Sequence, residues 1–350
     1  MMKAGLIGCG RIAGKHAEAI RQLQDLEIAA VSDTVQKKME AFLQHHAVHS
    51  NVQTTETCRD LFFQKDLDVI IITAVSSLHA AMAVEALKHG KHVILEKPMA
   101  LSIQDADAII RHARLFNRKV LVCHQLRYRP LFRHVKALME EGVLGKPYFG
   151  SASIRIHRGP DYYESAPWRG TWDQDGGMLI NQGIHVIDLL VWLFGNPEAV
   201  HGRVSRALPC KETEDVAAAV LSFENGAAGV VEANTMTQPD NLGYSLSLFC
   251  ERGTIAFSGN GLEKIERWHV DGSGQNVPPV MAPGEKSEHQ WMYEQFLEAA
   301  ADDTEVLVNA VEGKRALETI FAMYQSHGTG RSTALPLPEF ATSWMKEREI

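Results

Sequence analysis

Two charged residues at the end of a buried strand pattern are the first candidates for chemistry in this chain. In "KHVILEKPMA" (91–100), the apolar run is followed by Glu96 and Lys97, and then by Pro98, which cannot continue a central strand. An ammonium group at the carboxyl end of a parallel strand could hydrogen-bond a substrate hydroxyl and assist its deprotonation. The alternative is a surface ion pair, which is worth under about 1 kcal/mol.

A second group of polar residues lies on a predicted helix, "DGGMLINQGIHVIDLLVWLFG" (175–195). Asn181, His185 and Asp188 recur at i, i+4 and i+7, so we expect them to share one face of a largely apolar helix. A lone histidine in such a helix is more often a core residue. Three aligned polar side chains favour a lined cavity instead, because buried polar groups need partners. We therefore predict His185 as the general base and Lys97 as its electrostatic partner.

A glycine-rich turn near the beginning of the chain predicts a nucleotide site. "GLIGCGRIAGKHAEAI" contains Gly8-x-Gly10-x-x-Ala13 between a strand pattern and a helix pattern, which suits a diphosphate at a helix N-terminus. Asp33 ends the next strand pattern, where a carboxylate could accept hydrogen bonds from ribose hydroxyls. It would also repel a 2′-phosphate, so NAD is favoured over NADP. The alternative is that Asp33 only caps a helix.

Aromatic and arginine residues are concentrated in "IRIHRGPDYYESAPWRGTWDQDGG" (154–177). Flat aromatic faces beside fork-shaped donors suit a polyhydroxylated ring or an anionic sugar derivative. The alternative is an aromatic loop that covers the core. "HQLRYRP" (124–130) adds further polar side chains. The 16 histidines are dispersed without metal-ligand spacing, so we predict no metal site.

Two different patterns of elements must position these residues. Up to about residue 124, short apolar runs alternate with helical patterns, which predicts a doubly wound parallel sheet of the Rossmann type. Later strand patterns are longer and include hairpin signals such as Asn225-Gly226, which predicts an α+β domain with a large, open, mostly antiparallel sheet. We predict an NAD(P)-binding domain at 1–124 and a substrate-binding and oligomerisation domain at 125–350. The expected later strands are 147–157, 198–208, 215–236 and 243–259, with helices at 127–141, 178–194 and 289–326.

Composition excludes several classes of protein. The 350 residues are 45% hydrophobic with a formal charge of −8, so no basic surface for nucleic acid is expected. The longest apolar runs are too short to span a bilayer. The five cysteines form no CxxC, and no signal-peptide pattern is present, so we expect a cytoplasmic protein.

Five stretches together resemble one known family, that of glucose–fructose oxidoreductase, inositol dehydrogenase and rhizopine catabolism protein. These stretches are the glycine turn, "SSLHAAMAVEALKHGKHVILEKP" (76–98), "WRGTWDQDGG" (168–177), "INQGIHVIDL" (180–189) and "ETEDVAAAVLSFENGAAG" (212–229).

The resemblance implies an NAD(P)-dependent dehydrogenase acting on a sugar or cyclitol CH–OH group, assembled as a homodimer or homotetramer through the C-terminal sheet. It implies that Lys97, in the EKP motif, is catalytic and that His185 is the acid/base. Many relatives have aspartate four residues before this histidine, whereas this chain has Asn181. The pattern is most similar to nucleotide-sugar enzymes such as UDP-N-acetylglucosaminuronate 3-dehydrogenases.

We therefore predict hydride transfer between a secondary hydroxyl of a sugar or nucleotide sugar and nicotinamide. One alternative is an inositol or aldose dehydrogenase acting on a free ring. Another is a non-catalytic sensor of dinucleotide and sugar. The predicted catalytic residues are Lys97, His185, Asn181 and Asp188. The predicted cofactor-binding residues are Gly8, Gly10, Arg11, Ile12, Asp33, Thr73, His79, Glu96, Lys97, Gln125, Trp168 and Arg169. The predicted substrate-binding residues are Arg127, Tyr128, Arg155, Tyr163, Asn181 and His185.

Overall fold

The chain folds into two compact units, each with its own sheet. The computed structural model describes residues 1–46, 51–272, 286–348 and 350. The first unit comprises Met1–Tyr128 and Gly284–Lys314, and the second comprises Arg129–Pro283 and Arg315–Ile350.

The division into units differs from the predicted boundary at two places, residues 125–128 and the segment that ends at Lys314. The predicted second domain contains everything after residue 124, whereas the segment ending at Lys314 groups with the first unit. The reason is helix α9 (Glu288–Ala301), which packs against α1 (Arg11–Ile20). The predicted helix 289–326 is therefore two helices, because residues 302–309 separate α9 from α10 (Ala310–Thr329).

The first unit has a six-stranded parallel sheet in the order β3-β2-β1-β4-β5-β6. This confirms the predicted doubly wound fold. Every residue of β4 is buried, and β1 and β5 are buried except at their first residues, as expected for a sheet covered on both faces. The short edge strand β3 was not predicted. The strands are β1 (Met2–Ile7), β2 (Leu26–Ser32), β3 (Gln53–Thr55), β4 (Val69–Ile72), β5 (His92–Leu95) and β6 (Val120–Val122).

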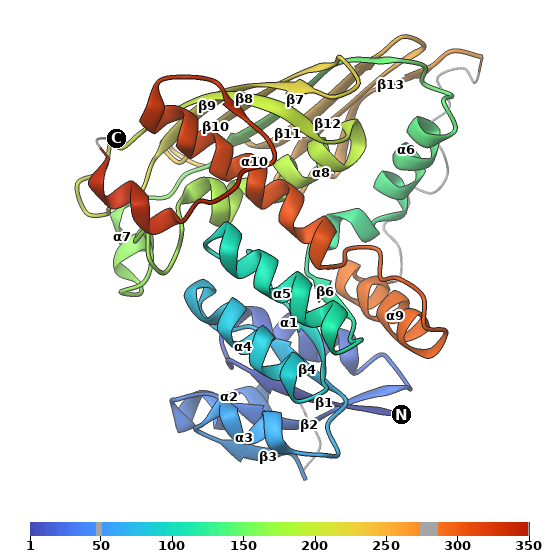
Figure 1. Cartoon of the computed structure of the whole chain (residues 1–350), viewed down its shortest axis with the longest axis vertical. Helices are drawn as coiled ribbons and strands as arrows, with labels where there is room; N and C mark the ends of the chain where they lie inside the picture. Colours follow the sequence, from blue (N-terminus) through green and yellow to red (C-terminus); the bar gives the residue numbers. More distant parts are fainter. Residues whose placement is uncertain (47–50, 273–285, 349) are drawn as a thin grey trace. The chain divides into compact units, whose positions relative to one another are not determined.

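Helices connect these strands in the alternating pattern that the sequence predicts. Helices α4 (Ser76–Lys88) and α5 (Ile103–Leu115) lie side by side (Figure 1). The Ser102 hydroxyl caps α5 by accepting a hydrogen bond from the Asp105 amide at 3.0 Å. The remaining helices between the strands are α2 (Gln36–His45) and α3 (Cys58–Phe63).

The second unit has an eight-stranded sheet in the order β13-β12-β11-β7-β10-β9-β8-β14. Strands β7 and β10 are parallel and the other neighbours are antiparallel, which confirms the predicted mostly antiparallel sheet. The strands are β7 (Pro147–Arg155), β8 (Pro197–Ser205), β9 (Val216–Phe223), β10 (Ala228–Asn234), β11 (Gly243–Cys250), β12 (Gly253–Gly259), β13 (Lys264–Val270) and β14 (Thr333–Ala334).

Helix α8 (Ile184–Phe194) packs against β7 and β11 of this sheet (Figure 1). The approach is close at Gly150 of β7, where an added Cβ would lie 2.6 Å from Leu190 of the helix. Residues alternate between buried and exposed along β9, so only one face of this strand is covered. The other helices of this unit are α6 (Pro130–Glu140) and α7 (Pro160–Glu164), with most of α10. Among the described residues, no helix is both long enough and apolar enough to cross a membrane.

Candidate functional site

The turn after β1 has the geometry of a dinucleotide cradle. Gly8 has φ +95°, and an added Cβ would lie 2.8 Å from backbone atoms of Thr73 and Ala74. Only glycine fits there. An added Cβ at Gly10 would meet nothing within 4 Å, so the start of α1 is open to a close-approaching group. The Thr73 hydroxyl supports the turn, because it donates to the Gly8 carbonyl oxygen at 2.6 Å.

Asp33 lies beside this cradle, directly after β2. Its Oδ2 accepts a hydrogen bond from the Cys9 amide at 2.9 Å, and its Oδ1 accepts one from the Val35 amide at 3.0 Å. Each carboxylate oxygen keeps a further lone pair for a ribose hydroxyl. The first unit therefore fits a dinucleotide, with Gly8 and Gly10 admitting the diphosphate and Asp33 suited to the ribose. Arg11 is exposed and Ile12 half-buried at the start of α1.

Lys97 follows β5 on the same edge of the parallel sheet, because the carboxyl ends of its strands share one edge. Lys97 is half-buried and Glu96 is buried. Burial by itself raises the pKa of the Glu96 carboxyl. The hydrogen bond from His16 and the charge of Lys97 outweigh it, and the pKa falls to about 2. Glu96 is therefore a buried carboxylate that is charged at neutral pH.

His79 holds the turn that contains Lys97. Its Nδ1 lies 2.7 Å from the Pro98 carbonyl oxygen, and its Nε2 lies 3.0 Å from that of Ala74. Direct contact of this buried ring with a cofactor stays a prediction. Gln125 is half-buried in the 3₁₀ turn after β6 (Gln125–Tyr128).

The same turn carries two of the predicted substrate contacts. Arg127 is fully buried, and its Nη1 donates to Glu312 Oε2 at 2.7 Å. Tyr128 is also buried. Contact of these two side chains with a substrate stays a prediction, and the ion pair gives Arg127 a structural role in any case.

In the second unit, the predicted site helix begins with a π-helical turn, Leu179–Gly183, and continues as α8. A π turn has a wider spacing than an α turn and often occurs at functional sites. From residue 175 to residue 194, every residue is buried except Asn181 and His185. Asp188 is only 1% exposed. The predicted shared face is therefore divided, since Asn181 and His185 are accessible and Asp188 lies in the interior.

Two buried carboxylates hold the beginning of this helix. Asp175 Oδ1 accepts a short hydrogen bond from Asn181 Nδ2, and its Oδ2 accepts one from the Gly170 amide at 2.8 Å. Glu214 Oε1 accepts from the Leu179 amide at 2.8 Å. Sequence reasoning assigned neither carboxylate a role. The motif "ETED" (212–215) was visible, but its partners lie far from it in the chain.

Gly177 is required at the same place. Its φ is +108°, and an added Cβ would lie 2.4 Å from the Tyr324 hydroxyl and 2.6 Å from Glu214 Oε2. The Tyr324 hydroxyl also donates to Glu214 Oε1 at 2.7 Å. Burial raises the pKa of Glu214 to about 7, although Lys211 and these hydrogen bonds act in the opposite direction.

The aromatic segment surrounds the guanidinium of Arg169. This group lies 4.3 Å from the ring centroid of Tyr162 and 4.5 Å from that of Trp168. Gln182 Nε2 donates to the Tyr162 hydroxyl at 2.9 Å, which joins the segment to the π turn. A cavity of about 560 Å³ lies here, lined by Arg169 and Tyr163 among others.

Two further predicted substrate contacts have structural partners. Arg155 Nε and Nη2 donate to the Glu232 carboxylate at 2.9 and 2.6 Å, which is a bidentate pair on neighbouring strands. Tyr163 is buried, and burial raises the pKa of its hydroxyl. Their contacts with a substrate stay predictions.

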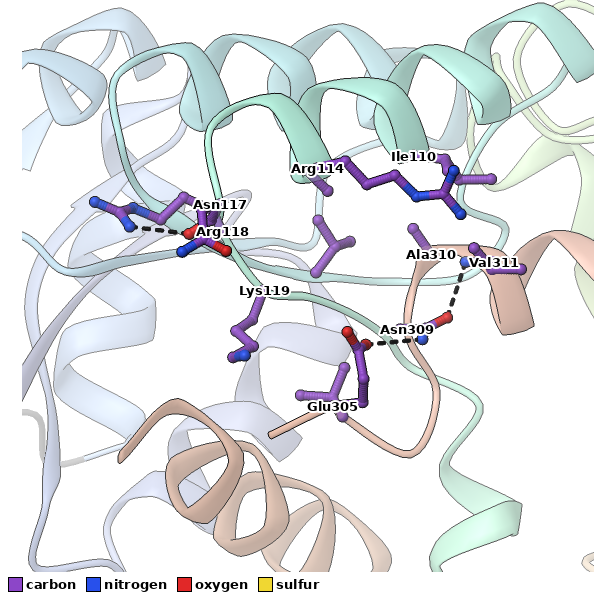
Figure 2. A pocket seen from close by; sticks show the side chains of 12 residues that line it. Ile110, Arg114, Asn117, Arg118, Lys119, Glu305, Asn309, Ala310 and Val311 are labelled. Carbon is purple, nitrogen blue, oxygen red and sulfur yellow. Dashed lines mark hydrogen bonds between the residues drawn. The ribbon is translucent and has the colours of Figure 1, made fainter. Parts of the chain in front are cut away.

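A cavity in the first unit lies away from the predicted site residues. Figure 2 shows this cavity, of about 320 Å³, lined by residues at the end of α5 and the start of β6 and by residues 305–311. It lies at the amino end of β6, opposite the edge that carries Gly8 and Lys97. No predicted site residue lines it.

Comparison with known proteins identifies the family. A family profile described as "Oxidoreductase family, NAD-binding Rossmann fold" matches residues 2–124, and a profile of the GFO/IDH/MocA C-terminal domain matches residues 132–256. A solved structure of the WlbA dehydrogenase from Chromobacterium violaceum, in complex with NADH and UDP-GlcNAcA, is 28% identical. It has a TM-score of 0.87, and the match covers 96% of both chains.

Two curated relatives match over part of their length. The uncharacterized oxidoreductase YrbE of Bacillus subtilis is 27% identical over 65% of this chain, and a D-apiose dehydrogenase of Rhizobium rhizogenes is 27% identical over 68%. These matches span 65% and 67% of the relatives' own lengths. With both sheets, the dinucleotide cradle and the two profiles in agreement, the chain belongs to the GFO/IDH/MocA family of NAD-binding oxidoreductases.

Proposed function

We propose that the chain transfers a hydride between a secondary hydroxyl of a sugar or nucleotide sugar and NAD. One observation carries the proposal: Asn181 and His185 are the two partly exposed residues of a segment, helical from residue 178, that is otherwise buried from 175 to 194. A partly exposed imidazole on an otherwise buried helix is suited to proton transfer. Bound NAD would supply the hydride acceptor.

Each residue has a distinct task in this proposal. His185 takes the proton of the substrate hydroxyl, and the Lys97 ammonium stabilises the developing alkoxide. Asn181 orients the hydroxyl, since Asp175 holds its amide group in one position. Asp188 is buried one turn beyond His185 and supports the helix rather than the substrate.

The preferred substrate class is a nucleotide sugar with an acidic group. The WlbA structure in complex with UDP-GlcNAcA supports this choice, because it matches 96% of this chain. The arginine and aromatic residues around the 560 Å³ cavity also suit an anionic sugar derivative. A free sugar is the second candidate, which the match to a D-apiose dehydrogenase supports.

Assembly through the second sheet is part of the proposal. Val216 and Val220 of β9 are 39% and 54% exposed on the uncovered face of this strand. Apolar side chains on such a face favour a homodimer or homotetramer that buries them.

A substrate panel tests the function. Purified protein is incubated with NAD or NADP and with UDP-GlcNAcA, D-apiose, myo-inositol and simple hexoses, and NADH formation is followed by its near-ultraviolet absorbance. Turnover of UDP-GlcNAcA with NAD is the expected result. A protein that binds NAD but turns over no member of the panel would be a ligand sensor, and the proposal would be wrong.

Two substitutions test the assigned roles. Lys97→Met and His185→Ala should each lower turnover by about a hundredfold while NADH binding stays nearly unchanged. Lys88→Met, at a surface ion pair on α4, and His201→Ala, at an exposed position of β8, are matched controls and should keep the original rate. Near-normal turnover in either of the first two variants would contradict the assignment of that residue.

A further inference from the structure

A continuous chain of hydrogen bonds lies in the interior beside Lys97. His16 of α1 is fully buried. Its Nδ1 lies 2.7 Å from the Tyr293 hydroxyl of α9, and its Nε2 lies 3.0 Å from Glu96 Oε1. Glu96 Oε2 in turn accepts from the backbone amide of Lys97 at 3.2 Å. Three segments far apart in the sequence therefore meet at one carboxylate.

When the hydrogens are assigned from the partners, every donor in this chain points toward Glu96. Burial raises the pKa of the Tyr293 hydroxyl well above its usual range, so the hydroxyl stays protonated and can donate to His16 Nδ1. The imidazole hydrogen is then on Nε2, which donates to Glu96 Oε1. The position of the hydrogen follows from this network of partners.

We propose that Tyr293, His16 and Glu96 form a positioning relay that holds the Lys97 turn and tunes the Lys97 ammonium. The proposal rests on the catalytic role proposed above for Lys97. Tyr293 and His16 act through Glu96, so they are positioning residues. Helix α9 supplies the Tyr293 hydroxyl to this relay. Without that hydroxyl, His16 Nδ1 would lose the hydrogen-bond partner that fixes its tautomer.

The other groups that face Glu96 agree with this arrangement. His289 of α9 packs edge-on against His16, with ring centroids 5.1 Å apart. Burial lowers the pKa of His289 to about 4, so its ring is uncharged at neutral pH. The Cys123 thiol also hydrogen-bonds Glu96, and burial holds the pKa of this thiol well above its usual range. Lys97 is therefore the adjacent cation on which the carboxylate can act.

A metal ion is the competing interpretation of this cluster. His16, Glu96 and His289 offer ligand atoms that lie within 4.8 Å of one another. Both ring nitrogens of His16 already have hydrogen-bond partners, so a metal ion would have to replace the bond to Glu96. We therefore expect a chelator to leave NADH binding and turnover unchanged. Loss of turnover that zinc restores would overturn the relay.

The reactivity of Lys97 tests the relay without a substrate. The protein is labelled with trinitrobenzenesulfonate over a range of pH, and the modification of Lys97 and of Lys88 is followed by mass spectrometry. Glu96→Gln removes the neighbouring negative charge and should lower the pH midpoint of Lys97 labelling by about one pH unit or more. Tyr293→Phe frees the carboxylate to turn toward the ammonium, and this should raise the midpoint.

Controls separate tuning from simple damage to the fold. Lys88 should keep its midpoint in every variant, and Tyr148→Phe, at an exposed tyrosine of β7, should leave Lys97 unchanged. If Tyr293→Phe does not fold, Glu96→Gln still tests the relay, because glutamine has the same shape as glutamate. An unchanged Lys97 midpoint in Glu96→Gln would refute the proposal.

Kinetics distinguish failure of the relay from failure of the proposed function. With UDP-GlcNAcA and NAD, Tyr293→Phe should lower kcat about five- to tenfold, as expected for one lost hydrogen bond, with KM nearly unchanged. In a Lys97→Met background, the same change should have no further effect on single-turnover hydride transfer. Equal losses in both backgrounds would contradict the relay. Shifted Lys97 labelling combined with normal turnover of Lys97→Met would support the relay and contradict the catalytic role of Lys97.

Discussion

Glu214 allows a quantitative test of how the site helix is held. The substitution is Glu214→Gln, which keeps the shape of the side chain and removes its ionisation. Glu214 is fully buried, and its Oε1 accepts hydrogen bonds from the Leu179 amide and the Tyr324 hydroxyl. A glutamine oxygen can accept both bonds, so the folded structure should be retained.

The magnitude follows from the pKa of Glu214. Burial raises it from 4.5 to about 7, so the folded protein binds the proton more tightly than the unfolded chain does. Glu214 therefore contributes stability that is fully present below pH 4.5 and is lost as the pH rises to about 7. The difference between these two pKa values corresponds to about 3 kcal/mol in the free energy of unfolding.

The assay compares the original protein with Glu214→Gln by urea denaturation from pH 4.5 to pH 8, followed by tryptophan fluorescence. As pH rises, the free energy of unfolding of the original protein should fall by about 3 kcal/mol relative to that of the variant. Glu224→Gln, at an exposed turn between β9 and β10, is the matched control. Its free energy of unfolding should differ from that of the original protein by the same amount at every pH. A constant or oppositely signed difference for Glu214→Gln would refute the reasoning.

Three further predictions concern the cofactor, the site helix and the assembly. Asp33→Asn should weaken NADH binding by about tenfold and reduce the preference for NADH over NADPH, as measured by fluorescence titration. Unchanged affinity for both dinucleotides would contradict the proposed contact of Asp33 with the ribose. Asn181→Asp should place a second carboxylate against Asp175 and lower the thermal midpoint more at pH 8 than at pH 5, and an equal loss at both would contradict this account. Val220→Asp should shift the mass measured by light scattering toward the monomer, and an unchanged mass would exclude this strand from the interface.

The elements that carry strong local patterns were predictable. Gly8, Gly10 and Asp33 lie in a strand–turn–helix sequence whose meaning is local, because the turn, the helix start and the second strand are adjacent in the chain. The inner strands of the first sheet were predictable because burial on both faces requires apolar residues at most positions. The three-residue strand β3, "QTT", has no such pattern, since it is a largely exposed edge strand.

Long-range partners were not predictable from the chain alone. The pattern of α9 predicts a helix, but it carries no information about which of the two units the helix belongs to. His16 and Tyr293 are 277 positions apart, and neither lies in a motif that indicates the other. The π turn at Leu179–Gly183 was missed because an apolar pattern of helical spacing does not reveal a single wider turn.

Asn181 illustrates how such a long-range partner changes the meaning of a residue. The sequence shows only a departure from the aspartate that many relatives have at this place. In the structure, Asn181 donates its amide hydrogen to Asp175, and the other oxygen of Asp175 already accepts the Gly170 amide. An aspartate at position 181 could not donate this bond while ionised, and the two adjacent carboxylates would repel one another. The asparagine is therefore the side chain that this carboxylate requires, and in the proposed function it leaves His185 as the proton-accepting group on this helix.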